Sequence, residues 1–214
     1  MPSESPTAAP SGYHHGDLPA ALRAATAELI TEKGATGFSL REVARRAGVS
    51  HAAPAHHFGD SRGLLTSVAT EGFHTLVDAF NSTQTIKDPF QRMNAMGRAY
   101  VKVAMTYPGH FGVMCANELI DCDDQAYQAV ANRAFEMLVE AVSEIAQTHN
   151  PDLNVGAAAT WIWTAVHGLA VLLPGFDQLD DKAGTDSVDL LLDQYTDLIA
   201  NGLFKATAAY PQNS

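Results

Sequence analysis

The sequence predicts an all-α protein in which a small N-terminal domain precedes a larger helical body. Apolar residues recur at helical spacing along nearly the whole chain, with no sustained alternation of apolar and polar residues and no hairpin turn pair. Proline and glycine interrupt this pattern at intervals, as is typical of helix ends. At 214 residues, 46% of them apolar, the chain is long enough to bury a sizeable core.

The N-terminal segment predicts a tail and a first helix. Residues 1–16 are rich in Pro, Ser, Ala and Gly and show no periodicity, which is typical of a disordered tail. A helix is expected over residues 18–33, with an apolar stripe along one side. Asp17 is a favourable N-cap residue for this helix, and Gly34 is a favourable stop.

A tight turn joins the second and third predicted helices. Ser39 followed three residues later by Glu42 is a capping-box pattern, which predicts a helix over residues 40–46. Gly48 then turns the chain, and a third helix is expected from its cap at Ser50 to residue 57.

The remaining residues, 61–214, predict a body of six helices, whereas residues 17–60 predict a separate three-helix domain. Asp60 can cap the long first helix of the body, and proline or glycine separates the later helices. The helices expected in the body span residues 61–81, 88–106, 109–119, 124–148, 153–173 and 185–206. The chain is therefore expected to contain about nine helices.

The turn around Gly48 has the pattern of a helix-turn-helix. Ala44 and Gly48 are four residues apart, and apolar neighbours on either side can fix the crossing angle of the two helices. Pro54 occupies an inward position of the second of these helices, where it is tolerated because it lies in the first turn. The residues expected on the exposed face are Ser50, His51, Ala52, Ala55 and His56 or His57. Positive charge for phosphate can come from Arg41, Arg45 and Arg62, which lie close in sequence.

Charge is divided unevenly along the chain. The net charge of −11 by itself argues against a nucleic-acid partner. Residues 1–70, however, hold six basic residues, six acidic residues and five histidines, whereas the rest of the chain holds seven basic and eighteen acidic residues. The N-terminal segment can therefore approach phosphate, which would repel the body.

One apolar run is long enough to suggest a membrane span. Residues 153–176 contain no Asp, Glu, Lys or Arg. The nearest flanking charges, Asp152 and Asp177, are acidic, so the positive charge that orients a span is missing. We interpret the run as a helix buried on several sides and expect no membrane partner.

The sequence also resembles the TetR family of bacterial transcription regulators. The residues that carry the resemblance are Tyr13-His14-His15-Gly16-Asp17-Leu18, Gly34, Phe38-Ser39-Leu40-Arg41-Glu42-Val43-Ala44, Ala47-Gly48-Val49-Ser50 and His57-Phe58. A weaker resemblance, in residues 99–114 and 163–173, is to the WHG-like ligand-binding domain of one subgroup. The resemblance implies a homodimeric regulator, most simply a repressor, that binds a palindromic DNA operator and is released by a small-molecule effector.

The family motif and the nearby arginines together give a set of expected DNA contacts. These are Ser39, Arg41, Arg45, Ser50, His51, Ala52, His56, His57 and Arg62. The chain departs from the family pattern in three places: Pro54-Ala55 replaces a usual Leu-Tyr, Ser61 stands where lysine is usual, and Pro19 replaces an often basic residue. Fewer phosphate contacts predict weaker, less salt-dependent binding. A further hypothesis is that the histidines of this region partly replace the missing cations, so that affinity rises as the pH falls through about 6.5.

The resemblance further implies an effector cavity in the body and a dimer interface. The residues expected to line the cavity are Met96, Tyr100, Met114, Trp163 and His167, because Trp and His add polar tips to an apolar wall. The last two long helices are expected to form a four-helix bundle across a two-fold axis. The interface residues expected there are Ala158, Trp161, Ala165, Leu172, Leu191, Tyr195 and Leu198.

Two other classes of protein stay open on the sequence alone. A small all-α enzyme that uses a metal or a cysteine would draw on His110, Cys115, Asp121 and Cys122, but their spacing lacks a tight ligand pair and no catalytic motif occurs. A structural helical protein fits the composition but leaves the N-terminal turn unexplained. We expect no enzymatic activity, no metal and no cofactor. Two cysteines and the lack of a basic segment ahead of an apolar one predict a cytoplasmic protein.

Overall fold

The structure is a computed structural model that describes residues 17–173 together with 193–195, 197–198, 202 and 204. All regular secondary structure in these residues is helical, as predicted. The helices are α1 (Leu18–Lys33), α2 (Leu40–Arg46), α3 (Ala53–Phe58), α4 (Ser61–Asn81), α5 (Pro89–Thr106), α6 (Pro108–Met114), α7 (Gln125–His149) and α8 (Val155–Leu172). The predicted tail and most of the helix predicted over 185–206 lie outside the described residues.

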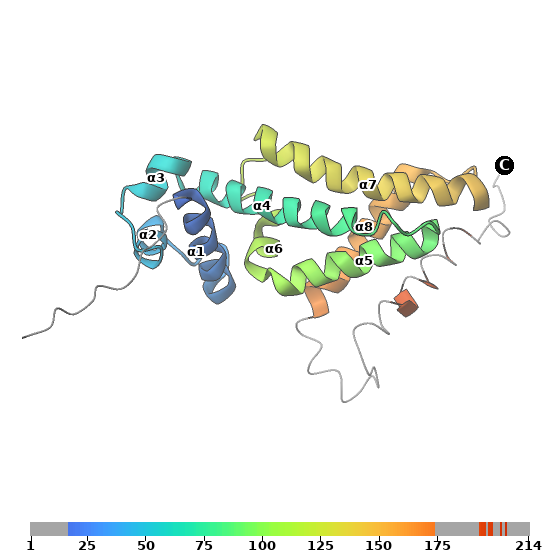
Figure 1. The fold of residues 1–214 in the computed structure, drawn as a ribbon, viewed down its shortest axis with the longest axis horizontal. Coiled ribbons are helices and arrows are strands. Elements are labelled where there is room, and N and C mark those ends of the chain that lie inside the picture. Colours follow the sequence, from blue (N-terminus) through green and yellow to red (C-terminus); the bar gives the residue numbers. More distant parts are fainter. Residues whose placement is uncertain (1–16, 174–192, 196, 199–201, 203, 205–214) are drawn as a thin grey trace, which may run out of the picture.

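The helices form two groups that α4 connects (Figure 1). α1, α2 and α3 lie together at one end, and α4 runs from α3 into the body. In the body, α4 packs against α5 and α7, and α8 packs against the same two helices. The short helix α6 contacts both α1 and α4, so it lies where the two groups meet.

Short polar side chains set the starts of the N-terminal helices. The side chains of Asp17, Ser39 and Asp60 each accept a hydrogen bond from the amide three residues further on, at 3.0, 3.3 and 2.9 Å. These bonds satisfy amides that have no partner within their own helix. Gly34 and Gly48 follow with φ angles of 79° and 68°, a region that favours glycine. The predicted caps at Asp17, Ser39 and Asp60 and both glycine turns are confirmed.

The limits of α3 and α6 need correction, whereas the other described helices agree with the predicted limits to within about two residues. α3 begins at Ala53 rather than at Ser50, because residues 50–52 form a turn and Ala52 occupies the N-cap position without a side-chain hydrogen bond. Pro54 is consequently the second residue of α3, where its missing N–H would have no helical partner. α6 begins at Pro108, which the prediction had placed between helices, and it ends at Met114 rather than at residue 119.

Each group of helices has its own apolar core. The N-terminal core contains Leu22, Leu29 and Val43, each with 0% of its surface exposed, and also Leu64 from the first turn of α4. The core of the body is formed by α4, α5, α7 and α8 with contributions from α1 and α6. Because Leu64 belongs to the N-terminal core, the start of α4 is held by the first three helices and the rest of it by the body.

The packing of α6 leaves no space for side chains at two glycines. A Cβ atom on Gly109 would lie 2.0 Å from the Ala27 carbonyl oxygen of α1. A Cβ atom on Gly72 of α4 would lie 2.8 Å from the Met114 sulfur of α6. Both distances are far below van der Waals contact. Glycine at these two positions therefore lets α6 approach both α1 and α4 closely.

The apolar helix α8 is the one described helix long and apolar enough to cross a membrane by length and composition. Ala159, Ile162, Val166 and Ala170 are buried along its length, and the helix packs against α5 and α7. Its opposite side exposes large apolar groups, with Trp161 50% and Leu172 58% exposed. The apolar composition thus serves the core on one side and leaves an apolar face on the other.

Replacing Gly109 by alanine is predicted to separate α6 from α1. Because the new methyl group would meet backbone, we expect the free energy of unfolding to fall by about 1–3 kcal/mol. Gly112→Ala is the matched control on the same helix, since its Cβ would meet only Ile30 Cγ2 at an ordinary 3.5 Å. That variant should be unchanged or more stable by about 0.5–1 kcal/mol. Urea titration of both variants checks this, and equal loss of stability would contradict the packing described.

Candidate DNA interface and ligand pocket

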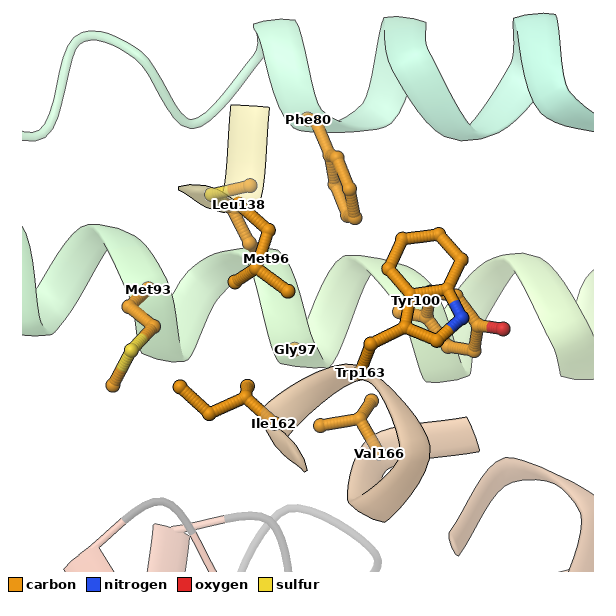
Figure 2. Close-up of a pocket in the computed structure, with 9 residues that line it drawn as sticks. All are labelled: Phe80, Met93, Met96, Gly97, Tyr100, Leu138, Ile162, Trp163 and Val166. Atoms are coloured by element: carbon orange, nitrogen blue, oxygen red, sulfur yellow. The ribbon is translucent and has the colours of Figure 1, made fainter. Parts of the chain in front are cut away.

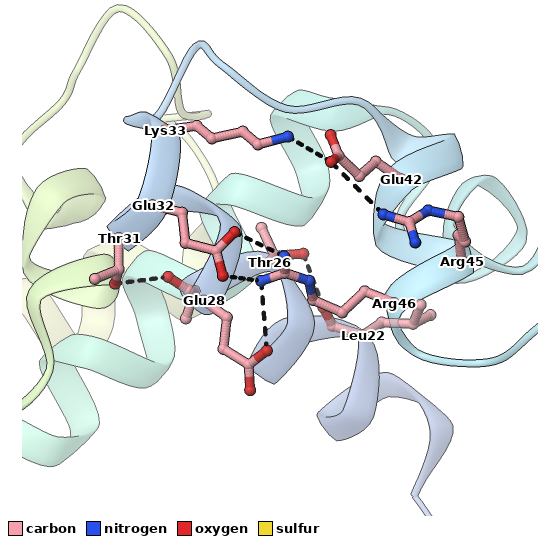
Figure 3. Close-up of polar contacts among 10 residues, drawn as sticks. Leu22, Thr26, Glu28, Thr31, Glu32, Lys33, Glu42, Arg45 and Arg46 are labelled. Atoms are coloured by element: carbon pink, nitrogen blue, oxygen red, sulfur yellow. Dashed lines mark hydrogen bonds and ion pairs between the residues drawn. The ribbon is translucent and has the colours of Figure 1, made fainter.

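Ion pairs between α1 and α2 use some of the basic groups of the N-terminal helices (Figure 3). Arg46 donates two hydrogen bonds to the Glu32 carboxylate, both at 2.7 Å, and lies 3.6 Å from Glu28. The hydrogen bond from Arg46 holds the pKa of Glu32 below its usual value. Lys33 lies 2.5 Å from Glu42, and that hydrogen bond likewise lowers the pKa of Glu42. Arg46 and Lys33 therefore hold α2 against α1.

Three other arginines remain exposed beside the helix-turn-helix. Arg41 and Arg62 are exposed, and no ion pair of either occurs among the described residues. The Arg45 side chain is 70% exposed. Its distance of 3.9 Å from Glu42, which Lys33 already binds, is at the upper limit for an ion pair. These are the same three arginines that sequence position assigns to phosphate. Their exposure leaves them available for phosphate, which is what a DNA contact requires.

α3 and the turn before it present an exposed face of histidine and alanine. His51, Ala52, Ala55, His56 and His57 are all exposed. Ala53 and Pro54 are buried on the opposite side, so Pro54 occupies the inward position expected of it. The rings of His56 and His57 lie 5.2 Å apart edge to face. This face carries no lysine or arginine, so any positive charge on α3 itself must come from its histidines.

The two serines predicted to contact DNA have different surroundings. Ser39 is exposed, but its hydroxyl oxygen is the N-cap acceptor of α2. Ser50 is exposed in the turn before α3 and does not cap that helix. The DNA contacts themselves stay a prediction.

A small apolar pocket lies between α4, α5, α7 and α8 in the body (Figure 2). The lining residues are Phe80, Met93, Met96, Gly97, Tyr100, Leu138, Ile162, Trp163 and Val166. The pocket has a volume of about 30 Å³, room for about two water molecules. Ligand pockets for drug-sized molecules are usually about 300–1,000 Å³. The pocket is therefore nearly filled by its own side chains.

The predicted lining set is divided between different places. Met96, Tyr100 and Trp163 line the pocket as expected. Met114 does not: it is 1% exposed and packs on Gly72 where α6 crosses α4. His167 lies on the far side of Tyr100, and its Nδ1 is 2.8 Å from the Tyr100 hydroxyl. Its ring lines an open groove instead.

The other lining residues were not selected from the sequence. Phe80, Leu138, Ile162 and Val166 occupy ordinary core positions on the stripes of three helices, and no spacing rule separates a pocket wall from a core. Gly97 offered the one local signal, since glycine inside a helix often has a packing reason. The nearest atom to a Cβ placed on Gly97 is Val166 Cγ2 at 3.9 Å, so its lack of a side chain adds to the space here.

A polar cluster joins α1, α4 and α6. One oxygen of Glu71 on α4 lies 3.0 Å from Arg23 Nε on α1 and 3.4 Å from His110 Nε2 on α6. The hydrogen bond with His110 and the charge of Arg23 hold the pKa of Glu71 below its usual value. Ionised Glu71 thus adds stability above the ordinary glutamate range, and this contribution is lost as the pH falls through the lowered pKa.

A second polar contact joins α4 to the loop after α6. Thr66 is 4% exposed, and its hydroxyl accepts a hydrogen bond from the Asp121 amide at 2.8 Å. The same hydroxyl donates to the Arg62 carbonyl in the first turn of α4. Thr66 therefore connects the loop of the body to the part of α4 nearest to α3.

The predicted dimer residues on α8 do not all face outward. Trp161, Ala165 and Leu172 lie along one stripe that is partly or largely exposed. Ala158 was placed wrongly on this face, because it is 3% exposed within the core of the protomer. Of the remaining predicted residues, Leu198 is 70% exposed, Tyr195 packs partly against the core, and Leu191 lies outside the described residues.

The residues considered for an enzyme do not gather into a site. In the part of the chain that the structure describes, no group of three or more His, Cys, Asp or Glu residues could hold a metal ion. His110 faces Glu71, and the Cys122 thiol lies 3.6 Å from the Asn117 carbonyl.

The fold and these two regions define a helix-turn-helix regulator with a ligand-binding body. Residues 22–68 match the family model described as "Bacterial regulatory proteins, tetR family", and residues 93–206 match the model described as "Tetracyclin repressor-like, C-terminal domain". The second match alone spans more than half of the chain, so the chain belongs to the TetR family. The protein is a ligand-responsive, DNA-binding transcription regulator rather than an enzyme.

Several solved structures are similar over most of their length. A protein of unknown function from Rhodococcus sp. RHA1 is 29% identical, with a TM-score of 0.73 over 90% of this chain and 98% of that one. PfmR, a TetR family regulator from Thermus thermophilus, is 19% identical, with a TM-score of 0.65 over 88% and 99%. FadR from Bacillus subtilis, solved with stearoyl-CoA, is 15% identical, with a TM-score of 0.68 over 86% and 98%. A comparison with curated proteins finds no match.

Replacing Thr66 by valine is predicted to loosen the contact between α4 and the loop. The Asp121 amide would lose the acceptor of its partly buried hydrogen bond, which lowers the free energy of unfolding by about 0.5–1.5 kcal/mol. Thr70→Val is the matched control one turn along α4, because the Thr70 hydroxyl bonds only to the backbone of its own helix. We expect it to change stability by less than about 0.5 kcal/mol. Thermal unfolding distinguishes the two, and equal effects would contradict the proposed role of Thr66.

Proposed function

We propose that this regulator binds a palindromic operator as a homodimer and that a small apolar effector releases it. Continuous packing from the pocket through α6 to α1, which holds α2, supports this proposal. The DNA-contacting residues would be those of the exposed face, Ser50, His51, Ala52, His56 and His57, with Ser39, Arg41, Arg45 and Arg62 beside it.

A homodimer is supported by the apolar face of α8. Trp161, Ala165 and Leu172 recur at helical spacing on the side away from the core, and Val171 beside them is 54% exposed. An exposed apolar stripe of this kind usually marks an interface. Pairing of α8 with its symmetry copy would cover it, and a two-fold dimer is what a palindrome requires.

Ring contacts give a physical route from the pocket to DNA. Tyr100 in the pocket wall lies 5.8 Å, centroid to centroid, from Phe111 on α6. Two residues earlier, Gly109 packs directly against the backbone of α1. A ligand that displaces Tyr100 would push Phe111, and α6 would carry the displacement to α1. Close-packed interiors transmit such shifts because they cannot absorb them locally.

The effector would act by shifting a population of conformations. A ligand that fits only an opened pocket stabilises the state in which the two recognition helices are spaced wrongly for the operator. The pocket suits this role because methionine side chains repack easily. FadR from Bacillus subtilis, solved with stearoyl-CoA, is a structural relative whose ligand includes a long apolar chain. We place the protein in the bacterial cytoplasm, where an operator is accessible.

DNA capture tests the operator proposal. Purified protein is incubated with random DNA fragments, and the retained fragments are sequenced at two salt concentrations. We expect one enriched palindrome. Arg41→Ala should weaken its binding by at least about fivefold and lower the salt slope by about two, because each protomer of the dimer loses one phosphate contact. Arg133→Ala is the control, since that arginine pairs with Glu140 in the body at 2.8 Å. Enrichment of no palindrome, or equal effects of both variants, would contradict the proposal.

The histidine face predicts tighter operator binding in mild acid. Protonation adds positive charge where α3 has no other cation, so affinity should be several-fold higher at about pH 6 than at about pH 8. Replacing His51, His56 and His57 by glutamine should remove most of this difference. His74→Gln is the control, because that histidine is exposed on α4 in the body. Equal affinities of the unmodified protein at both pH values would refute the role of the histidines.

A further inference from the structure

Two cavities meet at the contact between α5 and α8. The nearly filled pocket is lined by Tyr100 and Val166, and an open groove of about 450 Å³ begins one helical turn further along both helices. The groove is lined by residues of α5, α6, α8 and the segment after α6, including Ala104, Phe111, Cys115, Glu118, His167 and Ala170. Pocket and groove are neighbours, because Tyr100 of the pocket is in ring contact with Phe111 and His167 of the groove.

Four rings form the partition between these cavities. Tyr100 lies 5.2 Å from Trp163 and 5.8 Å from Phe111, and Phe111 lies 5.4 Å from His167, all between ring centroids. The Tyr100 hydroxyl is 2.8 Å from His167 Nδ1. This hydrogen bond is the polar contact within an otherwise apolar partition. A molecule passing from the groove into the pocket must displace these rings.

Both polar groups of the partition are uncharged near neutral pH. Burial raises the pKa of Tyr100 far above its usual value, so the hydroxyl stays protonated. Burial lowers the pKa of His167, so the imidazole stays neutral. A neutral Tyr hydroxyl or His imidazole can donate a hydrogen bond to a ligand carbonyl, and can donate to or accept from a ligand hydroxyl. Neither can compensate a buried ionic group.

The charge of the groove also disfavours an anionic ligand. Among its lining residues the charged side chain is Glu118, and none is lysine or arginine. A phosphate or carboxylate in the groove would therefore meet a like charge, and no described lining residue offers a cation to neutralise it. This arrangement disfavours ligands whose head group is anionic.

We propose that pocket and groove are one effector site that takes an uncharged amphipathic ligand: an apolar chain or ring in the pocket, with one hydroxyl or carbonyl at the Tyr100–His167 pair. This inference rests on the proposed function, because it names the ligand class for the same effector site. It distinguishes this chain from a regulator that reads an acyl-CoA, whose head group is polyanionic. Glu118 and the Tyr100–His167 pair are the specificity-determining residues.

Three decyl compounds that differ only in head group test the inference. Decan-1-ol, decanoate and decanoyl-CoA are each titrated into the purified full chain by calorimetry. Decan-1-ol should bind at least about tenfold more tightly than either anionic compound, because its head group is the one that needs no counter-charge. Tighter or equal binding of decanoyl-CoA, or binding of none of the three, would overturn the inference.

Paired variants separate the polar contacts from general packing. Tyr100→Phe should weaken decan-1-ol binding by about fivefold through loss of one hydrogen bond. Tyr127→Phe is its control, because Tyr127 lines neither cavity and bonds to the Met114 carbonyl. Glu118→Lys should raise the affinity for decanoate, whereas Asp152→Lys, at the opposite end of α8, should not. Equal effects within either pair would count against the assignment.

These titrations contain no DNA, so their outcome does not depend on whether the protein binds an operator. If an operator is captured but decanoyl-CoA binds best, the proposed ligand class is wrong, whereas the proposal that the protein binds an operator is retained. If decan-1-ol binds as expected but no operator is found, the ligand class stands and the operator proposal fails.

Discussion

The structure depends most on the close packing of α6 against α1 and α4. Gly109 of this short helix lies against the backbone of α1, and Met114 and His110 of the same helix lie against Gly72 of α4. A side chain at either glycine would clash with these atoms. The Glu71 carboxylate adds a polar contact at the same place, since it binds Arg23 of α1 and His110 of α6. Without this packing the N-terminal helices would be joined to the body by α4 alone, and a ligand in the body would have little means of moving them.

The N-terminal helices depend on charged groups, whereas the body depends on apolar packing. In the first, Arg46 and Lys33 are used to hold α2 on α1, which leaves Arg41, Arg45 and Arg62 for an external anion. In the second, methionine and aromatic side chains nearly fill a pocket that a ligand must reopen. A strongly acidic body beside a neutral N-terminal segment also favours one orientation toward DNA, because phosphate is repelled from the body.

The sequence predicts local structure better than it predicts the pocket. Asp17, Ser39, Asp60, Gly34 and Gly48 mark helix ends because capping and positive φ angles depend on neighbouring residues only. The start of α3 was misplaced because Ser50 has the chemistry of a cap, whereas the turn through residues 50–52 is set by tertiary packing. Met96, Tyr100 and Trp163 were found because they combine size with some polarity. Met114 and Ala158 were misplaced because an apolar residue gives no sign of which side of a helix faces a cavity, a core or a partner.

Whether α6 connects the pocket to the DNA-binding helices is best measured as the effect of a bound ligand on operator affinity. Operator affinity would be measured with and without saturating decan-1-ol, for the unmodified protein and for Gly109→Ala under conditions where that variant is folded. The account predicts that the ligand weakens operator binding by about 5–150-fold in the unmodified protein, and that this factor falls toward one when the contact of α6 with α1 is disturbed. A ligand that fills the pocket and leaves operator affinity unchanged would contradict it.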